Sequence, residues 1–193
     1  GQWVLTPGIW NISLGTSSRA LRSQSEVHLD AEVIPEDLDR LSTINEWLAD
    51  NTAASADPAD GQFEDFLELH NASASPVSLA GFFLSDDPLT PAQWALPAGT
   101  SIPAGGKLVV WADGEQEQNG VTAGQLHAPF KLSASGESIV LSTPDLQPVD
   151  SITFGPQSAN VSEGRFPDGG PLVGTLSVPT PAAPGPADGE SNV

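Results

Sequence analysis

One pattern recurs between residues 43 and 166: short runs of alternating apolar and polar residues are separated by stretches rich in Gly, Pro, Asp and Ser. In FLELH (66–70), Leu67 and Leu69 share one face, and Phe66, Glu68 and His70 share the other. Side chains of a β-strand point alternately to opposite faces of the sheet, so these runs indicate strands rather than helices. The sequence therefore predicts an all-β fold, an antiparallel β-sandwich of short strands and tight turns.

The alternation also predicts the core between the two sheets, because shifting a strand by one residue would turn its apolar face to solvent. The expected core residues are Leu67, Leu69, Phe82, Leu84, Val110, Ile139 and Ile152. The segment PEDLDRLSTINEWLADN (35–51) is less regular. Its Pro and early acids favour a short helix that ends near Leu41, and its second half fits either a helix or a strand.

The composition changes at both ends of this patterned block. Residues 1–42 hold two of the five Trp and three of the six basic residues but no sustained period. We expect an irregular N-terminal extension there, the end of a preceding region and a linker, with one strand at 26–34. The sandwich domain should occupy residues 43–176. Residues 177–193 are rich in Pro, Ala and Gly, which predicts an extended linker.

The charge of the chain excludes several classes of partner. Lys and Arg number 6 against 25 Asp and Glu, so the net charge is −19. Such a chain repels nucleic acids and anionic lipid surfaces, and no run of about 18 apolar residues could span a membrane. The absence of Cys removes thiolate nucleophiles and Cys-ligated zinc. The absence of Met suggests a piece of a longer protein, and the acidic, Lys-poor composition favours an exported bacterial one, extracellular or at the cell surface.

Six segments occur in an order and spacing that resemble a known family: INEWLADN, FEDFLELHN, VSLAGFFLSDDP, WALPAGTSIPAGGKLVVWADG, FKLSASGESIVLS and VDSITFGPQSANVSEGRFPDGG. Together, over about residues 44–170, they resemble the bacterial branch of the lamin-tail domain family. The resemblance implies an immunoglobulin-like β-sandwich in which INEWLA is the first strand. It also implies a building block of large exported multidomain proteins, and it offers no catalytic residues. No coiled-coil heptads are present, so the resemblance implies no filament-forming role for this chain.

The loop DPADGQFED (57–65) is the candidate ligand site. Asp57, Asp60 and Asp65 are the candidate ligands of a Ca²⁺ site, because Ca²⁺ binds carboxylate and carbonyl oxygens in loops. The spacing does not match an EF-hand, and Asp and Gly also occur in loops simply because they form turns. We therefore expect an ordinary acidic turn with no cofactor bound, and the calcium site is the alternative.

The other acids and histidines of the chain suggest no chemistry. Glu68 lies opposite the apolar face of its strand, where solvent exposure is the default. The histidines, His28, His70 and His127, form no ligand pair on one strand, so we expect each to pack at a strand edge or meet solvent. No serine lies in a G-x-S-x-G elbow, and Lys107 lacks a phosphate-binding loop. We therefore expect that the chain is not an enzyme.

The aromatic residues separate two functions. Trp94 and Trp111 could fill the sandwich core or stack on sugars at the surface, and their burial would favour the core. The leading expectation is a non-catalytic module of an exported bacterial multidomain protein, a spacer or protein-interaction domain that contacts other domains of its chain or a protein partner. The alternative is a carbohydrate-binding accessory module of a cell-surface protein or secreted hydrolase, with a polysaccharide as its partner.

Overall fold

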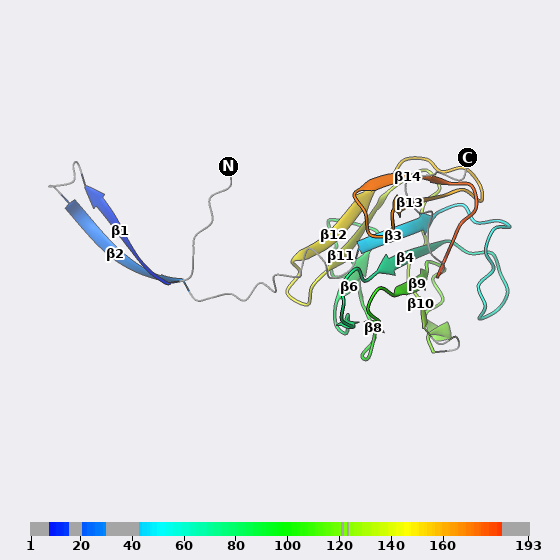
Figure 1. Ribbon diagram of the computed structural model, residues 1–193, viewed down its shortest axis with the longest axis horizontal. Coiled ribbons are helices and arrows are strands. Elements are labelled where there is room, and N and C mark those ends of the chain that lie inside the picture. The colour runs from blue at the N-terminus through cyan, green and yellow to red at the C-terminus, as the bar shows by residue number, and fades with distance from the viewer. Residues whose placement is uncertain (1–7, 16–20, 30–42, 121, 123, 183–193) are drawn as a thin grey trace. The chain divides into compact units, whose positions relative to one another are not determined.

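The computed structural model describes residues 8–15, 21–29, 43–120, 122 and 124–182. The chain divides into two compact units, residues 1–36 and residues 37–193. Each unit is considered by itself. Figure 1 shows the larger unit as two layers of strands.

The smaller unit contains a hairpin of two antiparallel strands, β1 (Gly8–Gly15) and β2 (Leu21–Leu29), with Trp10 opposite Val27. We had expected this region to be irregular apart from one strand at 26–34. The overlooked signal is the alternation of Trp10, Ile12 and Leu14 with polar residues, which is a strand period over only a few positions. The short helix expected before Leu41 lies outside the described residues.

The first layer of the larger unit is a six-stranded sheet in the order β10-β9-β4-β3-β13-β14. Its strands are β3 (Thr43–Leu48), β4 (Phe66–His70), β9 (Lys107–Trp111), β10 (Gln125–His127), β13 (Ser162–Phe166) and β14 (Leu172–Leu176). The segment INEWLA thus begins the sandwich as a strand, which resolves the ambiguity in favour of the resemblance. All pairs in this sheet are antiparallel except β9 with β10, which is parallel.

The second layer is a four-stranded antiparallel sheet in the order β12-β11-β6-β7. Its strands are β6 (Phe83–Ser85), β7 (Trp94–Ala95), β11 (Ser138–Ser142) and β12 (Pro148–Thr153). A further pair joins β5 (Val77–Ser78) to β8 (Ser101–Ile102). Within the described residues the one helical segment is the 3₁₀ turn η2 (Gln116–Gln118), and no helix there has the length and hydropathy to cross a membrane. The all-β sandwich prediction is confirmed.

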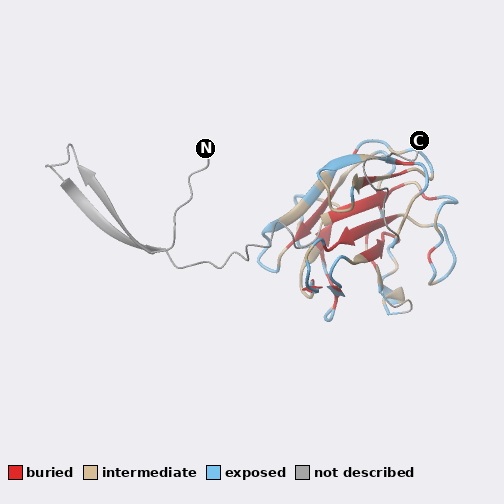
Figure 2. Cartoon of the chain, viewed as in Figure 1, coloured by how far each residue is buried: buried red, intermediate tan, exposed pale blue. Residues whose placement is uncertain are grey.

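The core between the layers follows the predicted phase of each strand. Five of the expected residues are buried, and Phe82 and Ile152 are partly buried against them; the five are Leu67, Leu69, Leu84, Val110 and Ile139. Trp47 and Phe154 extend this cluster, with ring centroids 6.2 Å apart. The strands at the centre of the six-stranded sheet are buried along their length (Figure 2).

The outer face of the same sheet is also covered, which the sequence did not predict. Phe66 packs there in a second apolar cluster with Leu48, Val109 and Trp111. Glu68, expected in solvent, has no exposed surface. The chain after β14 crosses this face, and the backbone N–H of Ala182 donates to Glu68 Oε2 at 2.6 Å. The prediction for Glu68 was wrong because its cover comes from a segment that we had placed in the C-terminal linker.

Candidate functional site

Glu68 lies at the centre of a buried polar network, called here the Glu68 cluster: Asn45, Glu68, Lys107 and Asp168. Lys107 Nζ is 2.9 Å from Glu68 Oε1 and 3.0 Å from Asp168 Oδ1. Asn45 Nδ2 donates to Glu68 Oε1 at 2.8 Å. Burial raises the pKa of Glu68, and the nearby Lys107 ammonium opposes that increase. Because the Ala182 N–H donates to Oε2, each carboxylate oxygen of Glu68 has a donor.

A second carboxylate on the same face ties down the C-terminal segment. Glu46 Oε1 accepts hydrogen bonds from Ser162 Oγ at 2.7 Å and from the Thr180 N–H at 2.9 Å. Thr180 Oγ1 donates to Glu46 Oε2 at 2.8 Å. With the Ala182 bond to Glu68, these contacts fasten residues 180–182 across the sheet. The arrangement stabilises the fold and presents no nucleophile to solvent.

A different group, called here the Asp57 cluster, consists of the buried Asp57, Asp113 and His127, the partly buried Glu64 and the exposed Asp60. Its first part is the loop between β3 and β4. The Gly61 N–H donates to the Asp57 carbonyl at 2.7 Å, and Asp57 Oδ1 accepts from the Ala59 N–H at 2.8 Å. Gly61 has φ 82°, the left-handed region that glycine adopts readily. This turn brings carboxylate oxygens of Asp57, Asp60 and Glu64 within 4.8 Å of one another.

The second part of the Asp57 cluster comes from the β9–β10 edge of the six-stranded sheet. Asp113 follows β9, and His127 ends β10 opposite Trp111. His127 Nδ1 lies 2.6 Å from Asp113 Oδ2 and 3.4 Å from Asp57 Oδ2. These three side chains are at most 1% exposed. A histidine and two carboxylates are thus enclosed beneath the loop.

Several polar atoms of this cluster lack partners. Among the described residues, six buried side-chain atoms have no hydrogen-bond partner. Three of them belong to this cluster: Asp57 Oδ2, Glu64 Oε2 and His127 Nε2. A fourth, Gln118 Oε1, is adjacent, because the amide nitrogen of Gln118 contacts Asp60. Burial, with repulsion from Asp113 and Glu115, raises the pKa of Glu64 to about 7. Burial also raises the pKa of Asp57, against the Ala59 hydrogen bond. The surroundings of Asp57 and Glu64 therefore disfavour the ionised form of these two carboxyl groups.

The family comparison agrees with this architecture. Residues 43–156 match the sequence model of the Lamin Tail Domain family. The chain belongs to that family. The matched part of this lamin-tail domain begins at β3 and includes both halves of the Asp57 cluster, whereas β13, β14 and the Ala182 contact lie beyond it. The comparison with curated proteins gave no match.

The lamin-tail domain places the three predicted calcium ligands in two locations. Asp57 and Asp60 come together, but the neighbouring acid that joins them is Glu64. Asp65 Oδ1 instead accepts a hydrogen bond from the Asn51 N–H at 3.1 Å. Asp113 and His127 were not predicted as members, because β-sheet pairing rather than sequence spacing brings them to the loop. The signal present was an acid two residues after the KLVVW strand.

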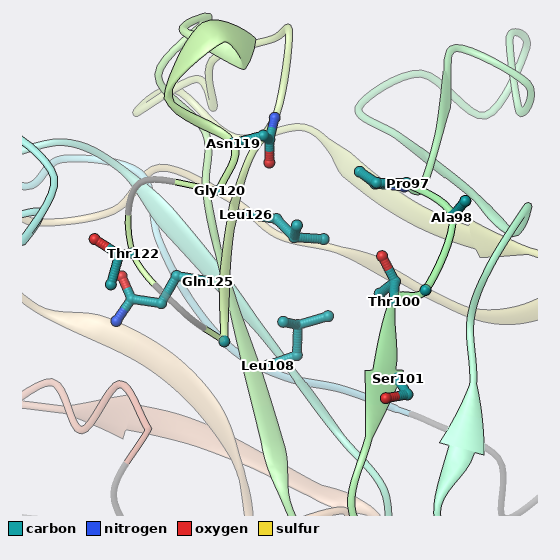
Figure 3. Close-up of a pocket in the computed structure, with 12 residues that line it drawn as sticks. Pro97, Ala98, Thr100, Ser101, Leu108, Asn119, Gly120, Thr122, Gln125 and Leu126 are labelled. Atoms are coloured by element: carbon teal, nitrogen blue, oxygen red, sulfur yellow. The ribbon is translucent and has the colours of Figure 1, made fainter.

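A pocket of about 500 Å³ opens on another part of the lamin-tail domain. It lies between the turn that contains Pro97 and Thr100 and the segment around Asn119, with Leu108 and Leu126 between them (Figure 3). None of its lining residues is titratable or aromatic. The pocket therefore offers hydroxyl, amide and apolar contacts, without an acid, a base or a ring for stacking.

Proposed function

We propose that this lamin-tail domain is a non-catalytic module of a larger exported bacterial protein, in which it serves as a spacer or protein-interaction domain. The observation that carries the proposal is the position of the tryptophans. Trp47, Trp94 and Trp111 are 0%, 7% and 2% exposed. Sugar-binding sandwiches stack their ligands on exposed rings, whereas Trp47 and Trp94 lie in the core between the sheets and Trp111 is buried in the second cluster on the outer face.

The polar groups support a non-catalytic role. Hydrolysis needs a nucleophile or bound water beside a positioned base, with access for a substrate. Glu68 is neutralised by Lys107 beneath the C-terminal segment, and the open pocket is lined by no titratable side chain. The net charge of −19 suits a module that stays soluble between other domains.

The sugar-binding alternative is tested by affinity electrophoresis of the purified chain in gels that contain soluble polysaccharides, with albumin as the non-binding control. We expect equal mobility with and without polysaccharide. Assays with chromogenic glycoside, ester and phosphodiester substrates should show no turnover. Retardation that is lost when Trp94 or Trp111 is replaced, or robust turnover by the chain alone, would overturn the proposal.

A replacement experiment on the parent protein distinguishes the spacer role from the interaction role. The module is exchanged for an unrelated immunoglobulin-like domain of similar length. Retained activity of the parent indicates a spacer, and loss of a specific partner indicates an interaction domain. Surface labelling of intact cells tests export, because an intracellular location of the parent would contradict that part of the proposal.

A further inference from the structure

We infer that the loop between β3 and β4 binds one calcium ion through Asp57, Asp60 and Glu64. Each side chain contributes a carboxylate oxygen, and these oxygens lie within 4.8 Å of one another. Calcium–oxygen distances are about 2.3–2.6 Å, so two ligands on opposite sides of one ion are separated by about 5 Å. A single Ca²⁺ can therefore contact all three. This site goes beyond the spacer or interaction role and does not depend on it.

The unpartnered atoms supply an independent reason for the ion. Asp57 has no exposed surface, yet its Oδ2 accepts no hydrogen bond and has the His127 ring nitrogen only at 3.4 Å. Glu64 Oε2 is likewise buried without a donor. A buried carboxylate oxygen that lacks a donor is strongly unfavourable, and coordination to a cation removes that penalty. The nearby Gln118 Oε1, also without a partner, is a neutral oxygen of the kind that completes calcium shells.

The charge balance also favours a cation. Asp57, Asp60, Glu64 and Asp113 bring four carboxyl groups together, and among the described residues His127 is their one basic partner in an ion pair. By contrast, Lys107 compensates the buried Glu68 directly. A divalent ion would supply positive charge to carboxyl groups that, among the described residues, form no ion pair with Lys or Arg.

The ligand chemistry favours calcium over zinc or magnesium. The three ligands are carboxylate oxygens on one loop, which suits the irregular geometry of calcium shells, whereas magnesium demands a near-ideal octahedron. Zinc prefers nitrogen and sulfur ligands. His127 Nδ1 is 2.6 Å from Asp113 Oδ2 and 3.4 Å from Asp57 Oδ2, so its closer contact holds Asp113 in place rather than a loop carboxylate. A transition metal held by Asp57, Asp113 and His127 is the competing assignment.

The test is isothermal titration calorimetry of the full chain, freed of metal with a chelator and titrated with CaCl₂ at constant ionic strength. We expect one site per chain and much weaker binding of MgCl₂. Asp57→Asn and Glu64→Gln should each weaken calcium affinity by at least about tenfold. Asp60→Asn, at an exposed position, gives the same test should Asp57→Asn fail to fold. Circular dichroism verifies folding of each variant.

Asp65→Asn is the matched control. It removes a charge next to Glu64 in sequence, but Asp65 is bonded to the Asn51 N–H and lies outside the ligand set. We expect wild-type calcium affinity for Asp65→Asn. The inference is overturned if the wild-type chain binds no calcium, or if Asp65→Asn removes binding while Glu64→Gln does not. It is also overturned if ZnCl₂ binds more tightly than CaCl₂ and that binding depends on His127 but not on Glu64.

Discussion

The Glu68 cluster and the Asp57 cluster each contain a carboxylate with no exposed surface, yet these two carboxylates have opposite surroundings. Glu68 has Lys107 2.9 Å from one oxygen and a backbone N–H on the other. Asp57 has one oxygen without a donor and a histidine 3.4 Å away as its nearest basic group. Burial alone therefore does not reveal what a carboxylate does. The donors around it distinguish a carboxylate that the fold compensates from one that is left without a donor.

Lys107→Met should have the largest effect, because it leaves Glu68 buried without its cation. Removing one partner of a buried ion pair costs about 3–5 kcal/mol of unfolding free energy. Urea denaturation followed by Trp fluorescence measures the loss. Lys107→Met combined with Glu68→Gln should recover much of it, since the uncompensated charge is then gone. If Lys107→Met alone costs less than about 1 kcal/mol, Glu68 does not need Lys107 for its burial.

Ending the chain after Ser177 should have the next largest effect. It removes the hydrogen bonds of Thr180 and Ala182 to the two buried carboxylates of the outer face. Allowing for partial exposure, we expect a loss of about 2–3 kcal/mol in denaturant unfolding. Thr180→Val, which removes one of these bonds, should lose about 1 kcal/mol. Unchanged stability in the shortened chain would mean that the outer face does not need this cover.

These two clusters also mark how far the sequence could predict the structure. The inner face followed from alternation, because Leu67 and Leu69 are positioned by the strand that contains them. Glu68 has the same local signal as a solvent-facing residue, and its burial depends on Ala182, 114 positions along the chain. No local pattern records such a contact, so the domain fold was predictable but its covered outer face was not.

The loop between β3 and β4 shows the same limit of sequence-based prediction at a smaller scale. The acidic loop was visible in the sequence, and Asp57 and Asp60 do come together there. Whether Glu64 or Asp65 joins them depends on the backbone turn and on the bridge between Ala56 and Phe63, the residue before Glu64. Neighbouring residues in an extended chain point to opposite sides, so Glu64 turns inward and Asp65 turns to Asn51.

Asp57→Asn should change stability in the direction opposite to that of Lys107→Met. In the metal-free protein the amide removes a buried charge that repels its neighbours and keeps an acceptor for the Ala59 N–H. We expect a gain of about 1 kcal/mol in EGTA. The same substitution should abolish any calcium-dependent rise in melting temperature. Destabilisation in EGTA would show that the metal-free cluster is already balanced.

Glu137 provides a smaller test of uncompensated burial away from both clusters. Burial raises the pKa of Glu137, the Ser133 N–H bond lowers it, and Asp86 and Asp65 raise it further. The folded state therefore holds its proton to higher pH than the unfolded state does, and stability falls as pH rises above the ordinary glutamate range. In thermal melts between about pH 4 and pH 8, Glu137→Gln should lose less stability than the wild-type chain on going to high pH. An identical pH slope would contradict the burial effect.

A crystal structure grown in millimolar CaCl₂ tests the contrast between the two clusters most directly. The account predicts density for one ion at about 2.3–2.6 Å from oxygens of Asp57, Asp60 and Glu64. In the same map Glu68 should bind no ion and should keep its contacts with Lys107 and Ala182. An empty Asp57 cluster whose oxygens bond only to water or protein, or an ion bound at Glu68 instead, would contradict the account.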